Sequence, residues 1–330
     1  FLMTTNSEFD VTVAFCGYNI KNFATLGIES FLHFNPEMRG NVVYFDDAST
    51  DGSREALEKR GIKVLSWIPE DLKRLKDAGQ ESNLDLRVSL IYGSIVKRTE
   101  TKYLLLIDGD AAFMSNDFFL KAMETIREHD AICVGHRSLI CLPDDVCDEY
   151  FKNDECEFIR KYLTKFSEDS YFKEKPESVS HFLNGCQREI TPGDYYAERM
   201  APTYLLLNAD LLKKHEVFTD IFEDMVNATH CMFANAVFDT WASWFYLVKQ
   251  LGYPIIALPL HEIEESVVHF DAISTQLKFP HAEPIWRAIN YIKRDPIVAK
   301  VCSFAGLPKD FLVLDLLNGT KGKEIKNTPD

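Results

Sequence analysis

The chain has 330 residues, of which 46% are hydrophobic and 26% are charged, a balance that excludes global disorder and collagen-like repeats. Its 51 acidic residues outnumber its 36 basic residues, which gives a formal net charge of −15. A surface this acidic repels phosphate backbones and anionic lipids, so nucleic acid is not expected to be the main partner.

The first third of the chain alternates between strand patterns and helix patterns. Apolar and β-branched runs predict strands at residues 11–15, 41–45, 62–67 and 103–107. Amphipathic stretches predict helices at residues 22–34, 53–60 and 84–98. The strands are apolar throughout instead of alternating with polar residues, which is typical of strands buried on both faces of a parallel sheet. This region therefore predicts an α/β fold with a mostly parallel sheet flanked by helices.

The rest of the chain divides into three parts. Residues 141–193 are charged and bear aromatics, which predicts an insertion with short helices of its own, for example at 157–166. Regular patterns then return and predict strands at residues 203–207, 253–258 and 266–270 and helices up to 215 and at 240–251. Residues 276–330 predict a helical extension with a frayed polar tail.

The cysteines and the hydropathy predict a reduced, cytoplasmic protein. The chain has eight cysteines but no C-x-x-C pair, and Cys16 and Cys133 lie in apolar runs as small core residues. The longest apolar stretch, around residues 251–260, is interrupted by Pro254 and Pro259 and is shorter than the roughly 18 residues that cross a membrane. Any membrane contact is therefore expected to be peripheral.

The strongest functional signal is Asp108-Gly109-Asp110, which directly follows the predicted strand at 103–107. Two carboxylates at the carboxyl end of a parallel strand point into the crevice in which α/β sheets bind ligands. Carboxylate oxygens are hard ligands that suit Mg²⁺ or Mn²⁺, and these ions bridge to substrate phosphates. The alternative is a solvated turn in which Gly109 supplies a positive φ.

A second acidic turn, Asp-Asp-Ala-Ser-Thr-Asp-Gly-Ser at residues 46–53, follows the predicted strand at 41–45. Its spacing matches several positions of an EF-hand calcium loop, but an EF-hand requires a helix before the loop, and here a strand precedes it. Carboxylates in a strand-to-helix turn instead suit hydrogen bonds from a bound base or ribose, with residues 51–53 starting the next helix.

In their order, three motifs resemble those of the GT-A glycosyltransferases, most closely the large inverting family 2. They are Val-Thr-Val-Ala-Phe-Cys-Gly-Tyr-Asn at 11–19, the acidic turn at 46–53 and Asp-Gly-Asp at 108–110. The resemblance covers about residues 10–120 and extends to about 200–271. It implies a GT-A fold, a nucleotide-diphosphate sugar as donor, and Mn²⁺ or Mg²⁺ as cofactor.

The resemblance also implies a division of the chain and a set of donor residues. A GT-A domain at 1–275 would contain a nucleotide-sugar-binding half at 10–135, the insertion at 141–193 and an acceptor and catalytic half at 200–275. Asp110 would bind the metal directly, and Asp108 would lie nearer the ribose or the waters of the metal. The residues expected to line the nucleotide pocket are Gly17, Tyr18, Asn19, Asp46 and Asp47.

The second half is expected to supply the general base and the acceptor contacts. Family members usually carry an acidic pair before a late helix, and because Phe238 occupies its first position here, the resemblance leaves Asp239 as the base. The alternative role of Asp239 is an N-cap. Trp241 and Trp244 would stack on the sugar rings of an acceptor, as would aromatics of the stretch at 144–196.

Two further residues complete the predicted site. Many GT-A enzymes add a late histidine to the metal ligands, which points to His269; a satisfied core histidine is the alternative reading, and His261 is the weaker candidate. Arg87 would face the diphosphate, although Leu-Arg-Val at 86–88 stands where the family has Ala-Arg-Asn.

Together these residues predict a metal-dependent glycosyltransferase that transfers a sugar to a hydroxyl of a glycan or glycoconjugate, with inversion. The alternatives are a retaining GT-A enzyme and a degenerate GT-A protein that only binds carbohydrate. A sugar-nucleotide pyrophosphorylase fits less well, because its glycine-rich loop is reduced here to the single Gly17.

Overall fold

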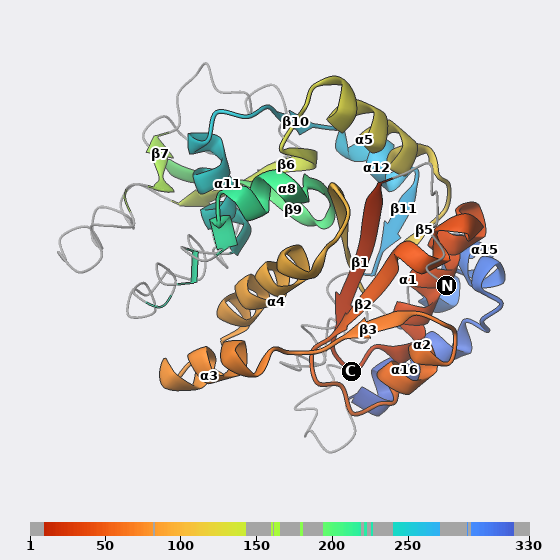
Figure 1. The fold of residues 1–330 in the computed structure, drawn as a ribbon. Coiled ribbons are helices and arrows are strands. Elements are labelled where there is room, and N and C mark those ends of the chain that lie inside the picture. The colour runs from red at the N-terminus through yellow and green to blue at the C-terminus, as the bar shows by residue number, and fades with distance from the viewer. Residues whose placement is uncertain are drawn as a thin grey trace, which may run out of the picture. The chain divides into compact units, whose positions relative to one another are not determined.

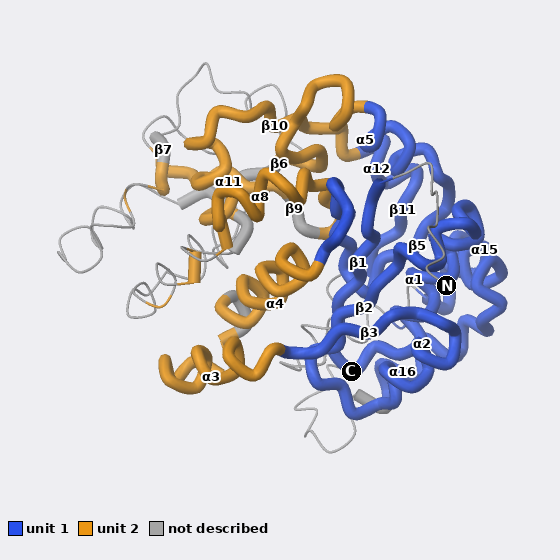
Figure 2. The backbone as a smooth tube through the Cα atoms, viewed as in Figure 1, with its two compact units in different colours: residues 1–67, 99–124, 261–330 blue, residues 68–98, 125–260 orange. Residues whose placement is uncertain are grey.

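The computed structural model describes residues 10–81, 83–142, 160, 162–165, 179–180, 194–218, 221–222, 226, 240–270, 289 and 292–319. The chain forms two compact units (Figure 2). Unit 1 consists of Phe1–Trp67, Thr99–Glu124 and His261–Asp330, and unit 2 consists of Ile68–Arg98 and Thr125–Leu260. Each unit is therefore assembled from segments that are distant in the sequence.

A parallel sheet forms the centre of unit 1 (Figure 1). Its strands β4 (Tyr103–Asp108), β1 (Val11–Gly17), β2 (Val42–Asp46) and β3 (Lys63–Leu65) lie in that order, and each neighbouring pair is parallel. The register places Cys16 beside Asp108 and Gly17 beside Asp46. The carboxyl ends of three strands, and the turns that follow them, consequently meet at one edge of the sheet.

Helix α1 (Lys21–Phe34) is the most enclosed helix of this unit. Residues on most sides of it are buried, because α15 (Pro296–Ala305) and α16 (Asp310–Gly319) pack against it in addition to strand β5 (Ala111–Phe113). A Cβ at Gly27 would lie only 2.4 Å from the carbonyl oxygen of Ala111, so this glycine allows the helix to approach β5 closely. The helices of the C-terminal extension therefore cover the same helix as β5.

Unit 1 contains one further strand and several further helices among its described residues. Strand β11 (Val267–His269) pairs antiparallel with β5. The other elements are the 3₁₀ helix η1 (Pro36–Asn41), α2 (Ser53–Glu58), α5 (Asp117–Glu128, which runs on into unit 2) and α12 (Leu260–Glu264). Phe31 of α1 makes edge-to-face contacts with Phe113 and Phe119, which anchors the helix to β5 and α5.

Unit 2 is built around a long antiparallel pair, β6 (Cys133–Leu142) and β9 (Tyr195–Asn208). Strand β10 (Ile255–Ala257) runs parallel to β6, and helix α11 (Thr240–Gln250) packs on β9. Two short strands extend the pair, β8 (Val179–Ser180) on β6 and β7 (Thr164–Lys165) on β9. The helices of this unit are α3 (Pro69–Asp77), α4 (Leu84–Arg98), α8 (Ala209–Lys214) and α11 (Thr240–Gln250).

The predicted fold class is confirmed, since the structure has a mostly parallel sheet with flanking helices. The strands and helices predicted for the first third are present as β1 to β4, α1, α2 and α4. One local prediction is wrong at its end, because Thr164 and Lys165 of the helix predicted at 157–166 form β7. Their backbone groups pair with β9, and this long-range pairing overrides the local helical pattern.

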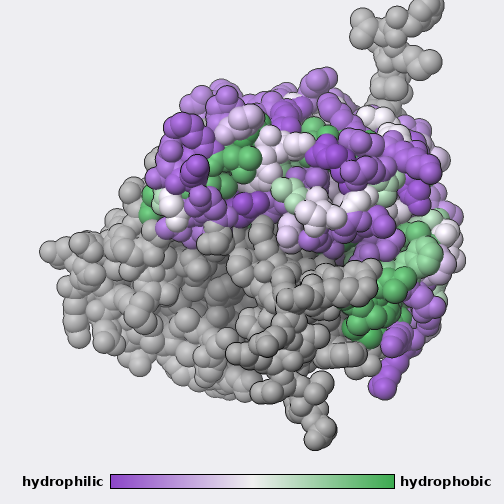
Figure 3. Space-filling view, turned by 90° about the horizontal axis from the view of Figure 1, so that it is seen from below, coloured by the Kyte–Doolittle hydropathy of each residue, from purple (hydrophilic) through white to green (hydrophobic). Residues whose placement is uncertain are grey.

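The surface of the described residues is largely polar. On the face drawn in Figure 3 these residues are mostly hydrophilic, with hydrophobic groups gathered in separate areas. The large apolar side chains that are exposed are Leu72, Leu120, Ile297, Phe311, Leu314 and Leu317. Among the described helices, none combines the length and the apolar character that crossing a membrane requires.

Candidate functional site

The Asp108-Gly109-Asp110 turn is held tightly against the end of β1. The amide of Gly109 donates a 2.8 Å hydrogen bond to the carbonyl oxygen of Cys16. A Cβ at position 109 would lie 2.4 Å from that oxygen, so the turn requires glycine. The side chain of Asp110 is almost fully buried, whereas that of Asp108 is 25% exposed. The close contact with β1 thus fixes both carboxylates at the carboxyl end of the sheet.

Strand β11 brings His269 to the same place. His269 pairs with Ala111 of β5, and the amide of Phe270 donates a 3.0 Å hydrogen bond to the carbonyl oxygen of Asp110. The Nε2 atom of His269 lies 3.4 Å from Oδ1 of Asp110 and 3.6 Å from Oδ2 of Asp108. One ligand atom from each of the three residues lies within 4.8 Å of the others. Residues 159 positions apart in the sequence thus converge on one point.

These separations suit a divalent cation. Two ligand atoms that each lie about 2.1 Å from one ion are roughly 3 to 3.6 Å apart when the angle between them is 90 to 120°. The two carboxylate–imidazole distances, 3.4 and 3.6 Å, fall in this range. The arrangement can therefore hold an ion without a large movement of the backbone.

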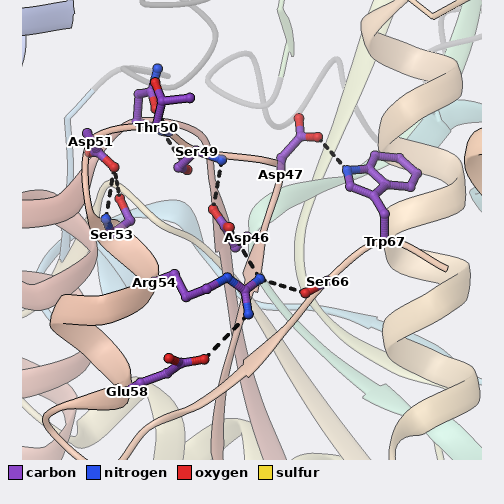
Figure 4. A network of polar contacts seen from close by, with 11 residues as sticks. Asp46, Asp47, Ser49, Thr50, Asp51, Ser53, Arg54, Glu58, Ser66 and Trp67 are labelled. Carbon is purple, nitrogen blue, oxygen red and sulfur yellow. Dashed lines mark hydrogen bonds and ion pairs between the residues drawn. The ribbon is translucent and has the colours of Figure 1, made fainter. Parts of the chain in front are cut away.

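The second acidic turn forms a network of polar contacts, and Asp46 is one of its acceptors (Figure 4). Its Oδ1 accepts a 3.1 Å hydrogen bond from the amide of Ser49, and its Oδ2 lies 3.4 Å from the guanidinium of Arg54. Arg54 also donates to Ser66 at 2.6 Å and lies 3.4 Å from Glu58. Asp46 is buried, so its carboxylate stabilises the shape of the turn from within.

Asp47 points to the other side of the strand, where Trp67 holds it. The indole Nε1 of Trp67 donates a 2.8 Å hydrogen bond to Oδ1 of Asp47, as Figure 4 shows. The indole also packs edge-on against Phe45, with ring centroids 5.7 Å apart. No functional role was predicted for Trp67 from the sequence. The available signal was an aromatic residue at the end of the strand predicted at 62–67, at the edge where the other turns meet.

The loop after β1 is fastened to this turn. Asn19 has a φ of 54°, and its amide donates a 3.0 Å hydrogen bond to Oγ of Ser49. In return, its Oδ1 accepts a 2.7 Å hydrogen bond from the amide of Thr50. The amide of Asp47 donates to the carbonyl oxygen of Gly17 at 3.1 Å. The residues predicted to line the nucleotide pocket at 17–19 and 46–47 are therefore brought together.

A buried tyrosine lies beneath this loop. The hydroxyl of Tyr44 would be 3.0 Å from a Cβ at Gly17, and the side chain of Tyr44 is completely buried. Burial raises the pKa of Tyr44 well above its usual value, and the negative charge of Asp46 adds to this effect. Tyr44 therefore stays neutral and supports the loop from below.

Four of the other predicted site residues belong to unit 2, and His261 belongs to unit 1. Asp239 lies outside the described residues, and of Trp241 the backbone alone is described, as part of α11. Trp244 is completely buried, so it exposes no ring face for the stacking expected of it. Arg87 lies on α4 and donates to the carbonyl oxygen of Glu81 at 3.2 Å. His261, the weaker metal candidate, is exposed on α12.

Comparisons with known proteins find similarity among solved structures. No protein-family model and no curated protein matches it. Among solved structures, it is similar to S. aureus TarS 1-349, with 15% identity, 97% of this chain and 74% of that chain covered, and a TM-score of 0.42.

Two further solved structures are named as sugar transferases. The mannosyltransferase PcManGT from Pyrobaculum calidifontis, in complex with GDP-Man and Mn²⁺, shows 12% identity and a TM-score of 0.43, with 98% of this chain and 78% of that chain covered. Mouse xyloside xylosyltransferase 1 shows 10% identity and a TM-score of 0.39, with 75% of this chain and 84% of that chain covered. At TM-scores below 0.5 the likeness assigns no activity, which has to be inferred from the residues of the site.

Proposed function

We propose that this chain is a metal-dependent GT-A glycosyltransferase that transfers a sugar from a nucleotide-diphosphate donor to a hydroxyl of an acceptor glycan or glycoconjugate. The observation that carries the proposal is the convergence of Asp108, Asp110 and His269 at the carboxyl end of β4. The loop at 17–19 and the turn at 46–53 follow neighbouring strands of the same sheet. A cation site and a set of groups suited to a nucleotide therefore share one edge.

The ligand set favours Mn²⁺ and accommodates Mg²⁺. Two carboxylates supply hard oxygen ligands, and the imidazole adds a nitrogen that Mn²⁺ accepts more readily than Mg²⁺ does. When bound, the cation neutralises the charge that develops on the leaving diphosphate. We assign Asp110 as the direct ligand because it is the more buried carboxylate, with Asp108 nearer the ribose or the waters of the metal.

The two carboxylates of the acidic turn take different roles in this proposal. Asp46 is engaged by the amide of Ser49 and by Arg54, so we assign it to shaping the turn. Asp47, oriented by Trp67, is assigned to the nucleotide. Tyr18 and Asn19 lie in the loop fastened to this turn, where they would line the same pocket. Arg87 stays a predicted diphosphate contact.

The acceptor is activated by a general base in this proposal. We assign that role to Asp239, whose position directly precedes α11. A carboxylate there would accept the proton of the acceptor hydroxyl as that oxygen attacks the sugar from the face opposite the diphosphate, which inverts the anomeric centre. Asp239→Asn should then retain donor binding and lose turnover.

The decisive experiment compares Asp110→Asn with a matched control. Purified protein is incubated with a panel of nucleotide-diphosphate sugars and Mn²⁺, and release of the nucleoside diphosphate is measured with and without acceptor glycans. Asp110→Asn should lower turnover by roughly 100-fold or more, because it removes a direct ligand, whereas loss of an outer partner alone costs 10- to 100-fold. The control Asp117→Asn removes an exposed carboxylate of unit 1. Turnover by Asp110→Asn at the wild-type rate would refute the metal assignment.

A further inference from the structure

The first turn of α1 is capped by residues from elsewhere in the chain. Ile20 occupies the N-cap position and forms no side-chain cap hydrogen bond. Instead, the amide of Lys21 donates a 2.9 Å hydrogen bond to Oδ2 of Asp51, and the amide of Asn22 donates a 2.6 Å hydrogen bond to Oδ2 of Asp315. A helix start needs acceptors for its first amides, and here two carboxylates supply them from a distance.

Asp315 belongs to α16 and binds Asn22 twice. Its Oδ1 accepts a 2.6 Å hydrogen bond from Nδ2 of Asn22, in addition to the backbone contact. The same Nδ2 donates to the carbonyl oxygen of Phe311 at 3.1 Å, one turn earlier in α16. Helix α16 accordingly packs against α1. One asparagine thus joins α1 to the C-terminal helix.

The carboxylate of Asp315 is held in an unfavourable place. Its side chain is buried, and this burial raises the pKa of Asp315 to about 6, opposed by the hydrogen bonds from Asn22 and reinforced by the charge of Asp51. At neutral pH the group is ionised and lies near a second carboxylate. Burying a charge costs desolvation free energy, so stability alone does not explain this carboxylate. The residues that it holds in place offer another explanation.

What it positions is the loop predicted to hold the nucleotide. Lys21 and Asn22 follow the loop at 17–19 with one residue between. Asp51, the other cap, belongs to the turn at 46–53, where its Oδ1 also accepts from the amide of Ser53 at 3.0 Å. The start of α1 therefore ties the loop after β1, the turn after β2 and α16 together through hydrogen bonds.

We propose that Asp315 is a positioning residue for the donor site: from the C-terminal helix it fixes the start of α1, and so holds the loop at 17–19 and the turn at 46–53 ready for the nucleotide. This inference rests on the proposed function. Its physical basis is preorganisation, because a loop that is already ordered loses less conformational entropy when the ligand binds. Residues 276–330 then contribute to the donor site through Asp315.

The test compares Asp315→Asn with Asp310→Asn in the full chain. Asp310 is an exposed carboxylate at the start of the same helix, so this control removes an equal charge. The affinities for UDP, GDP and ADP are measured with Mn²⁺ by calorimetry. Asp315→Asn should weaken binding of the preferred diphosphate about tenfold, the effect expected when a charge-assisted hydrogen bond is lost. In turnover assays KM for the donor should rise, with kcat unchanged.

A second measurement reports the positioning itself. Hydrogen exchange of amides at residues 17–22 and 46–53 should be faster in Asp315→Asn than in Asp310→Asn, because the start of α1 opens more often. Asn22→Ala keeps the backbone donor and should give a smaller loss of affinity, and the double variant should bind no more weakly than Asp315→Asn. If Asp315→Asn fails to fold, Asn22→Ala carries the same comparison.

The outcomes separate this inference from the proposed function. Wild-type protein that binds none of the three diphosphates would overturn both. Wild-type protein that binds one of them, with Asp315→Asn binding and exchanging like Asp310→Asn, would overturn the role of Asp315 and leave the glycosyltransferase proposal standing.

Discussion

The two acidic turns of unit 1 contain the same residue type but use it differently. In the turn after β2, Asp46 and Asp47 accept hydrogen bonds from an amide, a guanidinium and an indole. In the turn after β4, Asp108 and Asp110 converge on Nε2 of His269, at 3.6 and 3.4 Å. The contacts of Asp46 and Asp47 shape a loop, whereas the ligand atoms of Asp108, Asp110 and His269 lie close enough together to receive a cation.

This contrast explains why an acidic motif alone does not identify a metal site. The turn at 46–53 has the EF-hand-like spacing, yet its carboxylates are spread over separate contacts with Ser49, Trp67 and Lys21. The turn at 108–110 has two carboxylates and needs a third ligand from β11. The chemistry of a carboxylate is thus decided by the groups that the fold brings opposite it.

The largest effect is expected from a methyl group added at Gly109. In Gly109→Ala the new Cβ would meet the carbonyl oxygen of Cys16 at 2.4 Å, so the turn must move away from β1. We expect the free energy of unfolding to fall by about 1–3 kcal/mol, and Mn²⁺ binding to weaken with it. Urea unfolding and calorimetry measure the two effects.

Gly40→Ala is the matched control, since a Cβ at Gly40 would have no heavy atom within 4 Å. It should leave Mn²⁺ binding unchanged. A Gly109→Ala protein with wild-type stability and metal affinity would show that the tight contact with β1 does not position the carboxylates, and the contrast between the two turns would lose its structural cause.

The next effect concerns the third ligand of the cluster. His269→Ala removes the imidazole that approaches both carboxylates. It should weaken Mn²⁺ binding at least as much as the roughly 10- to 100-fold that loss of an outer partner alone costs, with turnover partly restored at high Mn²⁺. The affinity of the turn at 46–53 for nucleoside diphosphate without metal should not change. Titration of Mn²⁺ followed by calorimetry provides the measurement.

His261→Ala is the control because His261 is an exposed histidine on the neighbouring α12. Equal losses in the two variants, or none in His269→Ala, would return His269 to the role of a packed core histidine. The cluster would then reduce to two carboxylates, and the imidazole would no longer distinguish it from the turn after β2.

The sequence predicted the parts of this site that depend on neighbouring residues. The turn at 108–110 could be located because five apolar residues precede it, and residues 46–53 because a strand pattern and a helix pattern flank them. His269 was a candidate because the resemblance to GT-A enzymes implies a late histidine ligand, and the structure brings it to the carboxylates. For the two acidic turns, a local pattern places the residues at strand ends, and the parallel topology brings those ends together. His269 instead reaches the site on β11, which pairs antiparallel with β5.

Contacts between distant segments could not be predicted in this way. Trp67 and Asp47 are 20 residues apart, and Asp315 and Asn22 are 293 residues apart, so no periodicity or spacing relates them. Asp315 also lies in a helix with a strongly apolar pattern, where a single carboxylate looks like a solvated residue. Its burial follows from the packing of α16 on α1, which is a tertiary property.

The smallest effect is expected at Trp67, and it tests whether Asp47 must be oriented to bind. Trp67→Phe keeps an aromatic ring against Phe45 but removes the Nε1 donor that holds Oδ1 of Asp47 at 2.8 Å. Loss of one hydrogen bond of this kind is worth about 1 kcal/mol, so the affinity for the preferred nucleoside diphosphate should fall about fivefold. Mn²⁺ binding at Asp110 should be unaffected, because that site lies on a different strand.

The same loss in Trp67→Phe and in Asp47→Asn, with no further loss when they are combined, would show that the indole acts through this carboxylate. A Trp67→Phe protein that binds the diphosphate like the wild type would show that the carboxylates of the two turns differ in partners but not in function.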